Sequence, residues 1–200
     1  MRVLVAYATR HGATAGIAER VAAALTTAGL SAEARSVEDI KDVGPYDAVV
    51  VGGAAYMLHW LKPAVRFARR HRKRLAARPV WLFSSGPLGT DLVDKDGKNV
   101  LETSRPKEFD ELTKLLRPRG EQVFFGAYDP GAPPVGLGER FVQHLPAVRA
   151  ALPAGDFRDW PAIDACAAQI AAELGAGQPR GQRHDPFAAG VAAPGTSRRA

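Results

Sequence analysis

Short apolar segments alternate with longer segments of helical periodicity along most of this chain. Residues 3–8 read VLVAYA, a continuous apolar run that is too short for a helix and typical of a strand covered by helices on both faces. Further strands are predicted over residues 31–37, 47–54, 79–86 and 122–128. Strands that alternate with helices predict an α/β fold with a parallel sheet, whose ligands bind beyond the carboxyl ends of the strands.

The predicted helices carry apolar residues three or four positions apart. Ile17, Val21 and Leu25 share one stripe ahead of Gly29, a residue type that commonly ends helices. Further helices are predicted over about 61–75, 106–117 and 160–174. Between residues 62 and 78 the sequence has eight Lys or Arg residues and no acid, within a net charge of +6. This basic segment is either a solvated helix face or a patch that attracts anions.

Length and composition favour a single domain outside the membrane. The 200 residues fit one hydrophobic core. Met1–Ala8 lacks the pattern of a signal peptide, and no run of about 18 apolar residues occurs. We therefore expect a cytoplasmic protein, with peripheral membrane contact left open.

The single cysteine and the histidines favour structural roles. Cys166 is the only cysteine, which excludes an internal disulfide, and it shares a helical stripe with Ile163 and Ile170, as a buried thiol would. His59, His71 and His144 lack metal-ligand spacing, so no metal site is predicted. No catalytic residue is identified, although His59 is a candidate proton donor.

The loop after the first strand has the composition of a phosphate-binding turn. It consists of Thr9, Arg10, His11, Gly12, Ala13 and Thr14. A phosphate monoester needs many donors in a small space, which a helix N-terminus supplies through backbone N–H groups, its dipole and nearby hydroxyls. Motifs for nucleoside triphosphates and dinucleotides are absent from the sequence, so a single terminal phosphate fits better. The side chains of Arg10 and His11 either contact the phosphate or point to solvent.

The segment AYATRHGATAGIAE, which contains this loop, resembles the phosphate loop of the flavodoxin-like family. The chain to about residue 175 is similar to the menaquinone-dependent protoporphyrinogen oxidases of that family. DAVVVGGAAYMLHWLKPAVRFARRH resembles their third strand, flavin loop and basic helix, and FRDWPAIDACAAQIAAEL resembles their final helix. The resemblance implies a three-layer sandwich with a five-stranded parallel sheet of order 2-1-3-4-5, which binds flavin mononucleotide (FMN).

In that family two further loops flank the flavin ring. The matching residues here are Gly53, Ala54, Ala55 and Tyr56 in the second loop, and Ser84, Ser85, Gly86, Pro87 and Leu88 in the third. Tyr56 offers an aromatic platform for the ring, and Trp60 is the alternative platform. No aromatic residue occurs within residues 84–90, which predicts an open flavin edge.

Two segments fall outside the regular alternation. Residues 128–159 form an insertion too long for an ordinary connection, and we expect a functional flap there. Residues 176–200 are rich in Gly, Pro, Ala and Arg and are predicted to be a disordered tail. The domain is therefore assigned to residues 1–175.

The resemblance implies an FMN-dependent oxidoreductase that passes reducing equivalents from an organic substrate to a quinone-like acceptor. The expected partners are a small-molecule substrate or a redox partner, with quinone or peripheral membrane contact and no nucleic acid; the oligomeric state stays open. One alternative is an electron carrier without a substrate of its own, although the sequence pI near 9.8 argues against the small acidic type. A relative that binds a deazaflavin and a cofactor-free binding module are further alternatives.

Overall fold

The computed structural model describes residues 1–132 and 153–175, which form a parallel sheet between two layers of helices. The sheet has the strand order β2-β1-β3-β5-β6. Its strands are β1 (Arg2–Ala8), β2 (Ser31–Ser36), β3 (Ala48–Tyr56), β5 (Val80–Ser85) and β6 (Gly120–Phe124). This arrangement confirms the α/β class and the predicted order 2-1-3-4-5, with each main strand parallel to its neighbours.

The continuous apolar run at the N-terminus is explained by burial on both faces. Val3 and Val5 pack toward one helical layer, Leu4 and Ala6 pack toward the other, and all four are fully buried. The edge strand β2 instead alternates exposed and half-buried residues, which accounts for its polar sequence.

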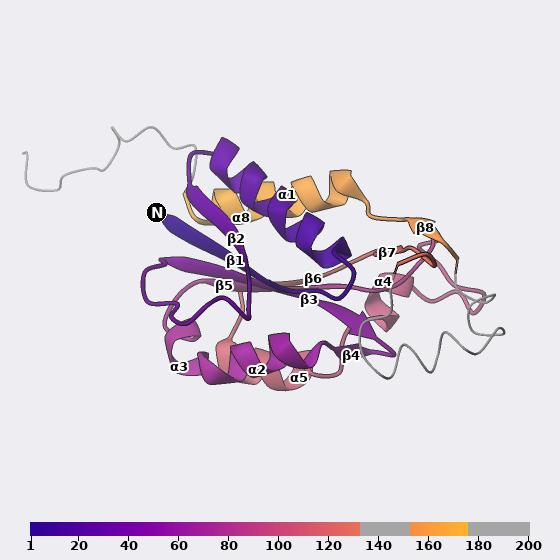
Figure 1. Ribbon diagram of the computed structural model, residues 1–200, viewed down its shortest axis with the longest axis horizontal. Coiled ribbons are helices and arrows are strands. Elements are labelled where there is room, and N and C mark those ends of the chain that lie inside the picture. The colour runs from indigo at the N-terminus through magenta and orange to yellow at the C-terminus, as the bar shows by residue number, and fades with distance from the viewer. Residues whose placement is uncertain (133–152, 176–200) are drawn as a thin grey trace, which may run out of the picture.

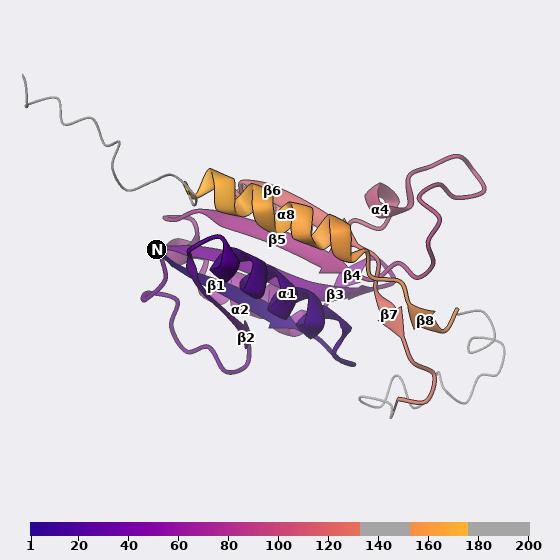
Figure 2. The same ribbon diagram turned by 90° about the horizontal axis from the view of Figure 1, so that it is seen from above.

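The helices cover both faces of the sheet, as Figures 1 and 2 show. On one face lie α1 (Ala13–Thr27) and α8 (Trp160–Glu173), and on the other lie α2 (Lys62–Arg70), α3 (Arg72–Leu75) and α5 (Phe109–Leu116). The short α4 (Val100–Thr103) lies on the connection after β5. The buried residues form one core cluster in each interface.

The predicted basic helix is divided in two at His71. The backbone of His71 leaves the helical region, and its N–H donates to the carbonyl of Phe67 at 3.0 Å. The buried His71 ring also packs on Phe67, with 4.8 Å between the ring centroids. Packing of a histidine into the core therefore ends α2, although the apolar stripe continues to Leu75.

The predicted fifth strand also differs from the structure. Only residues 120–124 pair with β5; residues 127–128 form β7, which pairs antiparallel with β8 (Gly155–Asp156). Gly126 causes the break, because its N–H donates to the carbonyl of Pro87 at 2.9 Å and its carbonyl accepts from Phe157. Residues 133–152 of the predicted flap and the predicted tail at 176–200 lie outside the described residues.

Candidate cofactor site at the carboxyl ends of the strands

Strand register brings the three predicted loops to one edge of the sheet. Ala8 of β1 pairs with Gly53 of β3, and Gly53 pairs with Ser84 of β5. The adjacent strands β1, β3 and β5 therefore end at nearly the same level of the sheet. Loops 9–14, 53–58 and 84–88 lie side by side although long stretches of sequence separate them.

The first loop turns tightly at Gly12 to start α1. Gly12 adopts a left-handed conformation, with φ of 84°, and its N–H donates to the Thr9 hydroxyl at 3.1 Å. A Cβ atom on Gly12 would meet nothing within 4 Å, so the requirement for glycine lies in the backbone angle. Within the described part of the chain, no side chain caps the first amides of α1. Uncapped amides at a helix start are suitable donors for a phosphate, so these residues fit FMN.

A buried hydrogen bond joins the first loop to the third. The hydroxyls of Thr14 and Ser85 lie 2.9 Å apart, with Thr14 0% and Ser85 2% exposed. Thr14 is in the first turn of α1, and Ser85 is the last residue of β5. Ser84 is also fully buried, and its hydroxyl has no partner among the described residues. The bond fixes the start of α1 against the end of β5.

The third loop lies against the ends of β3 and β6. The Gly86 N–H donates to the Phe124 carbonyl at 3.3 Å, and a Cβ atom on Gly86 would lie 2.7 Å from the Ala55 carbonyl oxygen. Only glycine permits this approach of two backbones. Pro87 and Leu88 follow at the half-buried rim.

The second loop is a β-hairpin. Tyr56 ends β3, Met57 and Leu58 form the two-residue turn, and the chain returns as β4 (His59–Trp60). Tyr56 is 40% exposed, and the Arg10 guanidinium carbon lies 4.7 Å from the centre of its ring. The structure thus places the aromatic ring of Tyr56 next to the first loop, with a cation from that loop stacked on it.

Trp60 is not available as the alternative platform, because it belongs to the core. It is 2% exposed, its Nε1–H donates to the Gly53 carbonyl at 2.9 Å, and its ring meets Phe109 edge-on at 5.1 Å. Trp60 therefore links the second loop to the core through its hydrogen bond to Gly53 and its contact with Phe109.

Glu108 holds the same hairpin and was not identified from the sequence. One carboxylate oxygen lies 2.9 Å from His59 Nδ1, and the other accepts from the backbone N–H of Trp60 at 2.9 Å. Burial alone would raise the pKa of Glu108, but the bonds from Trp60 and His59 outweigh it and lower the pKa. Glu108 therefore stays ionised and anchors His59 near Tyr56.

Arg158 is a second residue that sequence reasoning missed. Its guanidinium donates to both carboxylate oxygens of Asp156, at 2.8 and 2.6 Å, and to the carbonyl of Ala13 at 3.3 Å. It also covers the ring of Trp160, 4.4 Å from its centre. The hydrogen bonds from Arg158 outweigh burial and lower the pKa of Asp156. Nothing local signals the contact with Ala13, which is 145 positions away.

An open cleft of about 710 Å³ adjoins the first loop. His11, Gly12 and Ala13 line one side, and residues 127–130, residues 154–156 and Arg158 line the other. Tyr56 and residues 84–88 lie outside this lining. The cleft thus links the phosphate loop to both ends of the predicted insertion.

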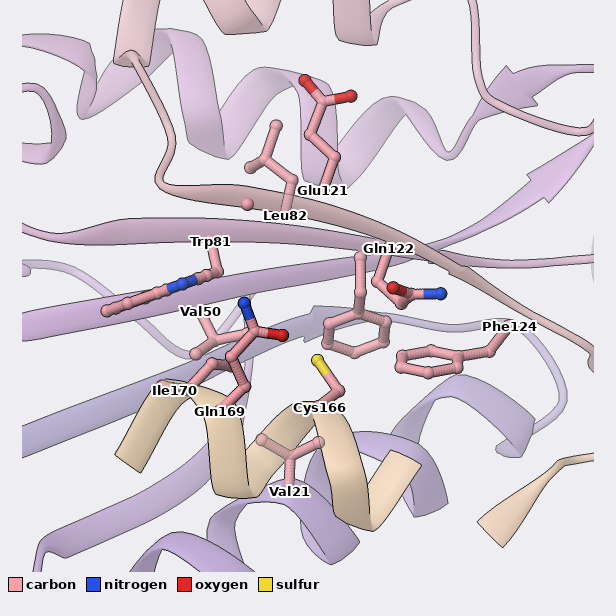
Figure 3. A pocket seen from close by; sticks show the side chains of 12 residues that line it. Val21, Val50, Trp81, Leu82, Glu121, Gln122, Phe124, Cys166, Gln169 and Ile170 are labelled. Carbon is pink, nitrogen blue, oxygen red and sulfur yellow. The ribbon is translucent and has the colours of Figure 1, made fainter. Parts of the chain in front are cut away.

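A smaller cavity of about 70 Å³ lies between α8 and the β5–β6 pair (Figure 3). Trp81, Cys166 and Gln169 are among its lining residues. Burial, followed by the charge of Glu173, raises the pKa of the Cys166 thiol to about 11. This cavity does not touch the three loops, and Cys166 behaves as the structural thiol predicted from its helical stripe.

The described residues include no group of three or more His, Cys, Asp or Glu side chains that could hold a metal ion. None of the helices in this part of the chain has the length and hydropathy needed to cross a membrane.

The fold is that of a doubly wound α/β protein, a class whose ligands bind at the carboxyl edge of the sheet. Residues 4–131 match the model of the flavodoxin domain, and the chain belongs to this family. Flavodoxins are FMN-binding flavoproteins that transfer electrons, in agreement with the predicted cofactor. No curated protein matches the sequence.

Solved structures share the fold at low sequence identity. A flavodoxin from the domain Archaea is 14% identical with a TM-score of 0.52, over 88% of this chain and 99% of that one. A flavodoxin from Streptococcus pneumoniae TIGR4 is 15% identical with a TM-score of 0.51, over 86% and 99%. Rubredoxin:oxygen oxidoreductase from Desulfovibrio gigas is 12% identical with a TM-score of 0.55, over 88% of this chain but 36% of its own. None of these similarities indicates that this chain acts on protoporphyrinogen or a quinone.

Proposed function

We propose that this protein is an FMN-dependent oxidoreductase that passes reducing equivalents from an organic substrate to a quinone-like acceptor. The observation that carries the proposal is the Thr14–Ser85 hydrogen bond, which joins an uncapped helix start to the neighbouring ring loop. This contact between the two loops supports a site in which a phosphate cradle and a ring site form one unit. FMN, when bound, supplies the capacity to accept and release electrons in steps of one or two.

In this proposal the first loop holds the phosphate. Backbone N–H groups within residues 9–14 and the hydroxyls of Thr9 and Thr14 donate to its oxygens. Gly12 provides the turn, because its left-handed angle is unfavourable for other residues. Arg10 and His11 belong to this loop, where the Arg10 guanidinium contributes positive charge and the His11 ring is a further polar contact for the phosphate.

The ring lies between the second and third loops. Tyr56 provides the platform on one face, and Gly53, Ala54 and Ala55 lead into it along β3. Backbone groups of residues 84–88 provide hydrogen bonds to the polar edge of the ring. His59, held through Nδ1 by Glu108, is the proton donor we propose for the exposed edge.

The candidate substrate and acceptor come from the resemblance of the sequence to menaquinone-dependent protoporphyrinogen oxidases. A porphyrinogen carries carboxylates, which suit the positive charge of this protein, and a menaquinone partitions into lipid. The proposal therefore includes a cytoplasmic location with peripheral contact to a membrane.

Mass spectrometry of the cofactor released from the purified protein tests the first step. We expect the released cofactor to be FMN. Release of a deazaflavin would identify that coenzyme as the cofactor instead of FMN. A colourless protein that does not bind added FMN would refute the proposal. The double substitution Thr14→Ala and Gly12→Val should sharply reduce FMN retention. Unchanged retention, with the fold intact by circular dichroism, would place the phosphate elsewhere.

The substrate is tested by mixing flavin-loaded protein with protoporphyrinogen and a menaquinone analogue. Turnover is the expected result, and its absence with intact flavin would remove the porphyrin assignment while leaving the cofactor site in place. A potentiometric titration distinguishes the electron carrier. Two well-separated one-electron steps without substrate turnover would favour that function instead.

A further inference from the structure

We propose that the tip of the β3–β4 hairpin and the outer face of α2–α3 form a docking surface for anionic lipid. The surface consists of Met57 and Leu58 at the tip, and of Lys62, Arg66, Arg70 and Lys73 along the helices. It extends the proposed function by naming the residues that contact the membrane. It depends on no flavin chemistry.

The hairpin tip exposes apolar residues in an unfavourable backbone conformation. Met57 is 94% exposed and Leu58 is 40% exposed. Both have positive φ angles, 50° and 63°, in a two-residue turn that usually carries Asn or Gly. Met57 gains almost no burial from the fold at such a turn, so its apolar side chain indicates a contact outside the protein.

The helices after the hairpin carry cations without acidic partners. Lys62, Arg66 and Arg70 follow one another at intervals of four residues, which places them along one side of α2, and Lys73 continues the series on α3. All are exposed, and none has a salt bridge within residues 1–132 and 153–175. The part of the row on α2, from Lys62 to Arg70, is about 12 Å long at 1.5 Å per residue.

The neighbouring cations provide a contrast, because acids neutralise them. Arg69 Nε donates to Glu111 at 2.9 Å, and Arg74 pairs with Asp42. These two cations belong to the structure of the domain. Arg72 and Arg78 have no salt bridge among the described residues either, but their guanidinium groups donate to backbone carbonyls, of Arg69 for Arg72 and of Val43 for Arg78. The row Lys62, Arg66, Arg70 and Lys73 has neither kind of partner in that part of the chain and can attract an external anion.

The tip and the row lie on the same side of the molecule. The backbone of Leu61 is hydrogen-bonded to Ala54, and α2 starts at the next residue. Figure 1 shows α2 beneath the sheet, with β4 at the end where that helix begins. A membrane that faces the outer side of α2 would contact the row together with the hairpin tip at the end of the second loop.

Lipid suits this surface better than a protein partner. A stable protein interface usually buries more than about 1,000 Å² with complementary shape, whereas the apolar part here is a two-residue tip. A bilayer interface needs no shape complementarity, because apolar side chains enter the headgroup region and cations bind lipid phosphates. Each unpaired cation near an anionic membrane improves binding about fivefold, and each buried CH₂ group about fourfold.

The experiment measures co-sedimentation of the full chain with vesicles of phosphatidylcholine, with and without phosphatidylglycerol. We expect binding to the anionic vesicles, weakening as salt rises, and little binding to phosphatidylcholine alone. The variant K62Q/R66Q should bind about 25-fold more weakly. The control K95Q/K98Q removes the same charge from the exposed loop between β5 and α4 and should bind as the unsubstituted protein does. Residues 176–200 are present throughout.

The tip is tested at constant charge. M57N should weaken binding to anionic vesicles, whereas M57L should preserve it, because leucine keeps an apolar tip. Absence of binding to anionic vesicles at low salt would overturn the proposal, and so would equal losses in K62Q/R66Q and K95Q/K98Q. Circular dichroism and the urea unfolding midpoint confirm that each variant is folded.

Discussion

The hydrogen bond between Thr14 and Ser85 gives the sharpest test of how the site is built. Thr14→Val keeps the volume and the β-branch but leaves the Ser85 hydroxyl, 2% exposed, without its partner. A buried polar group that loses its partner costs about 1–3 kcal/mol. Ser85→Ala should cost a similar amount for the same reason. Removing both hydroxyls should cost less than the sum, with a coupling free energy of about 1–2 kcal/mol.

Urea unfolding of the flavin-free protein measures these free energies, provided that the denaturant slope is unchanged among the variants. In thermal melts each kcal/mol should appear as about 2–4 °C. Thr27→Val is the matched control, because Thr27 is exposed in the same helix and bonds only the Ala23 carbonyl. It should change stability by less than about 0.5 kcal/mol.

Additive effects of Thr14→Val and Ser85→Ala, within about 0.3–0.5 kcal/mol, would refute the reasoning. FMN affinity, measured by quenching of flavin fluorescence, then separates two roles of Thr14. If its hydroxyl also contacts the phosphate, Thr14→Val should weaken FMN binding more than Ser85→Ala does. Equal losses would assign it a structural role only.

Three further predictions concern the surroundings of the site. Glu108→Gln should destabilise the protein at neutral pH, because it removes the ionised carboxylate that holds the hairpin. The pKa of Glu108 is lowered on folding, so the stabilisation that the carboxylate provides should be lost as the pH falls below about 4.5. The urea midpoints of the variant and the unsubstituted protein should therefore converge in acid. Cys166, whose pKa is raised to about 11, should resist iodoacetamide at pH near 8 in the folded protein and react in urea, as followed by mass spectrometry. Native reactivity equal to that of a free thiol would contradict its burial. Trp60→Phe should cost about 1 kcal/mol through loss of the bond to Gly53, and an unchanged urea midpoint would show that this bond contributes nothing.

The layers of the fold could be predicted because their signals are local. The apolar run at residues 3–8 requires a helical layer on each face of its strand. Gly29 favours the end of a helix whatever the tertiary packing of that helix. The prediction was wrong where a distant partner competes with the local pattern. Gly126 ends the fifth strand early by bonding Pro87 and Phe157, and burial of His71 interrupts the basic helix.

The sequence by itself determined the order of strands and helices, the turn at Gly12 and the presence of a hydroxyl-rich loop at a helix start, since these depend on neighbouring residues. Tertiary structure decided which groups meet: the side chains of Thr14 and Ser85 across 71 positions, those of Glu108 and His59 across 49, and the Arg158 guanidinium and the Ala13 carbonyl across 145. It also placed Trp60 in the core. Such contacts follow from strand register and layer packing, which depend on the whole chain at once and leave no periodicity in any single segment.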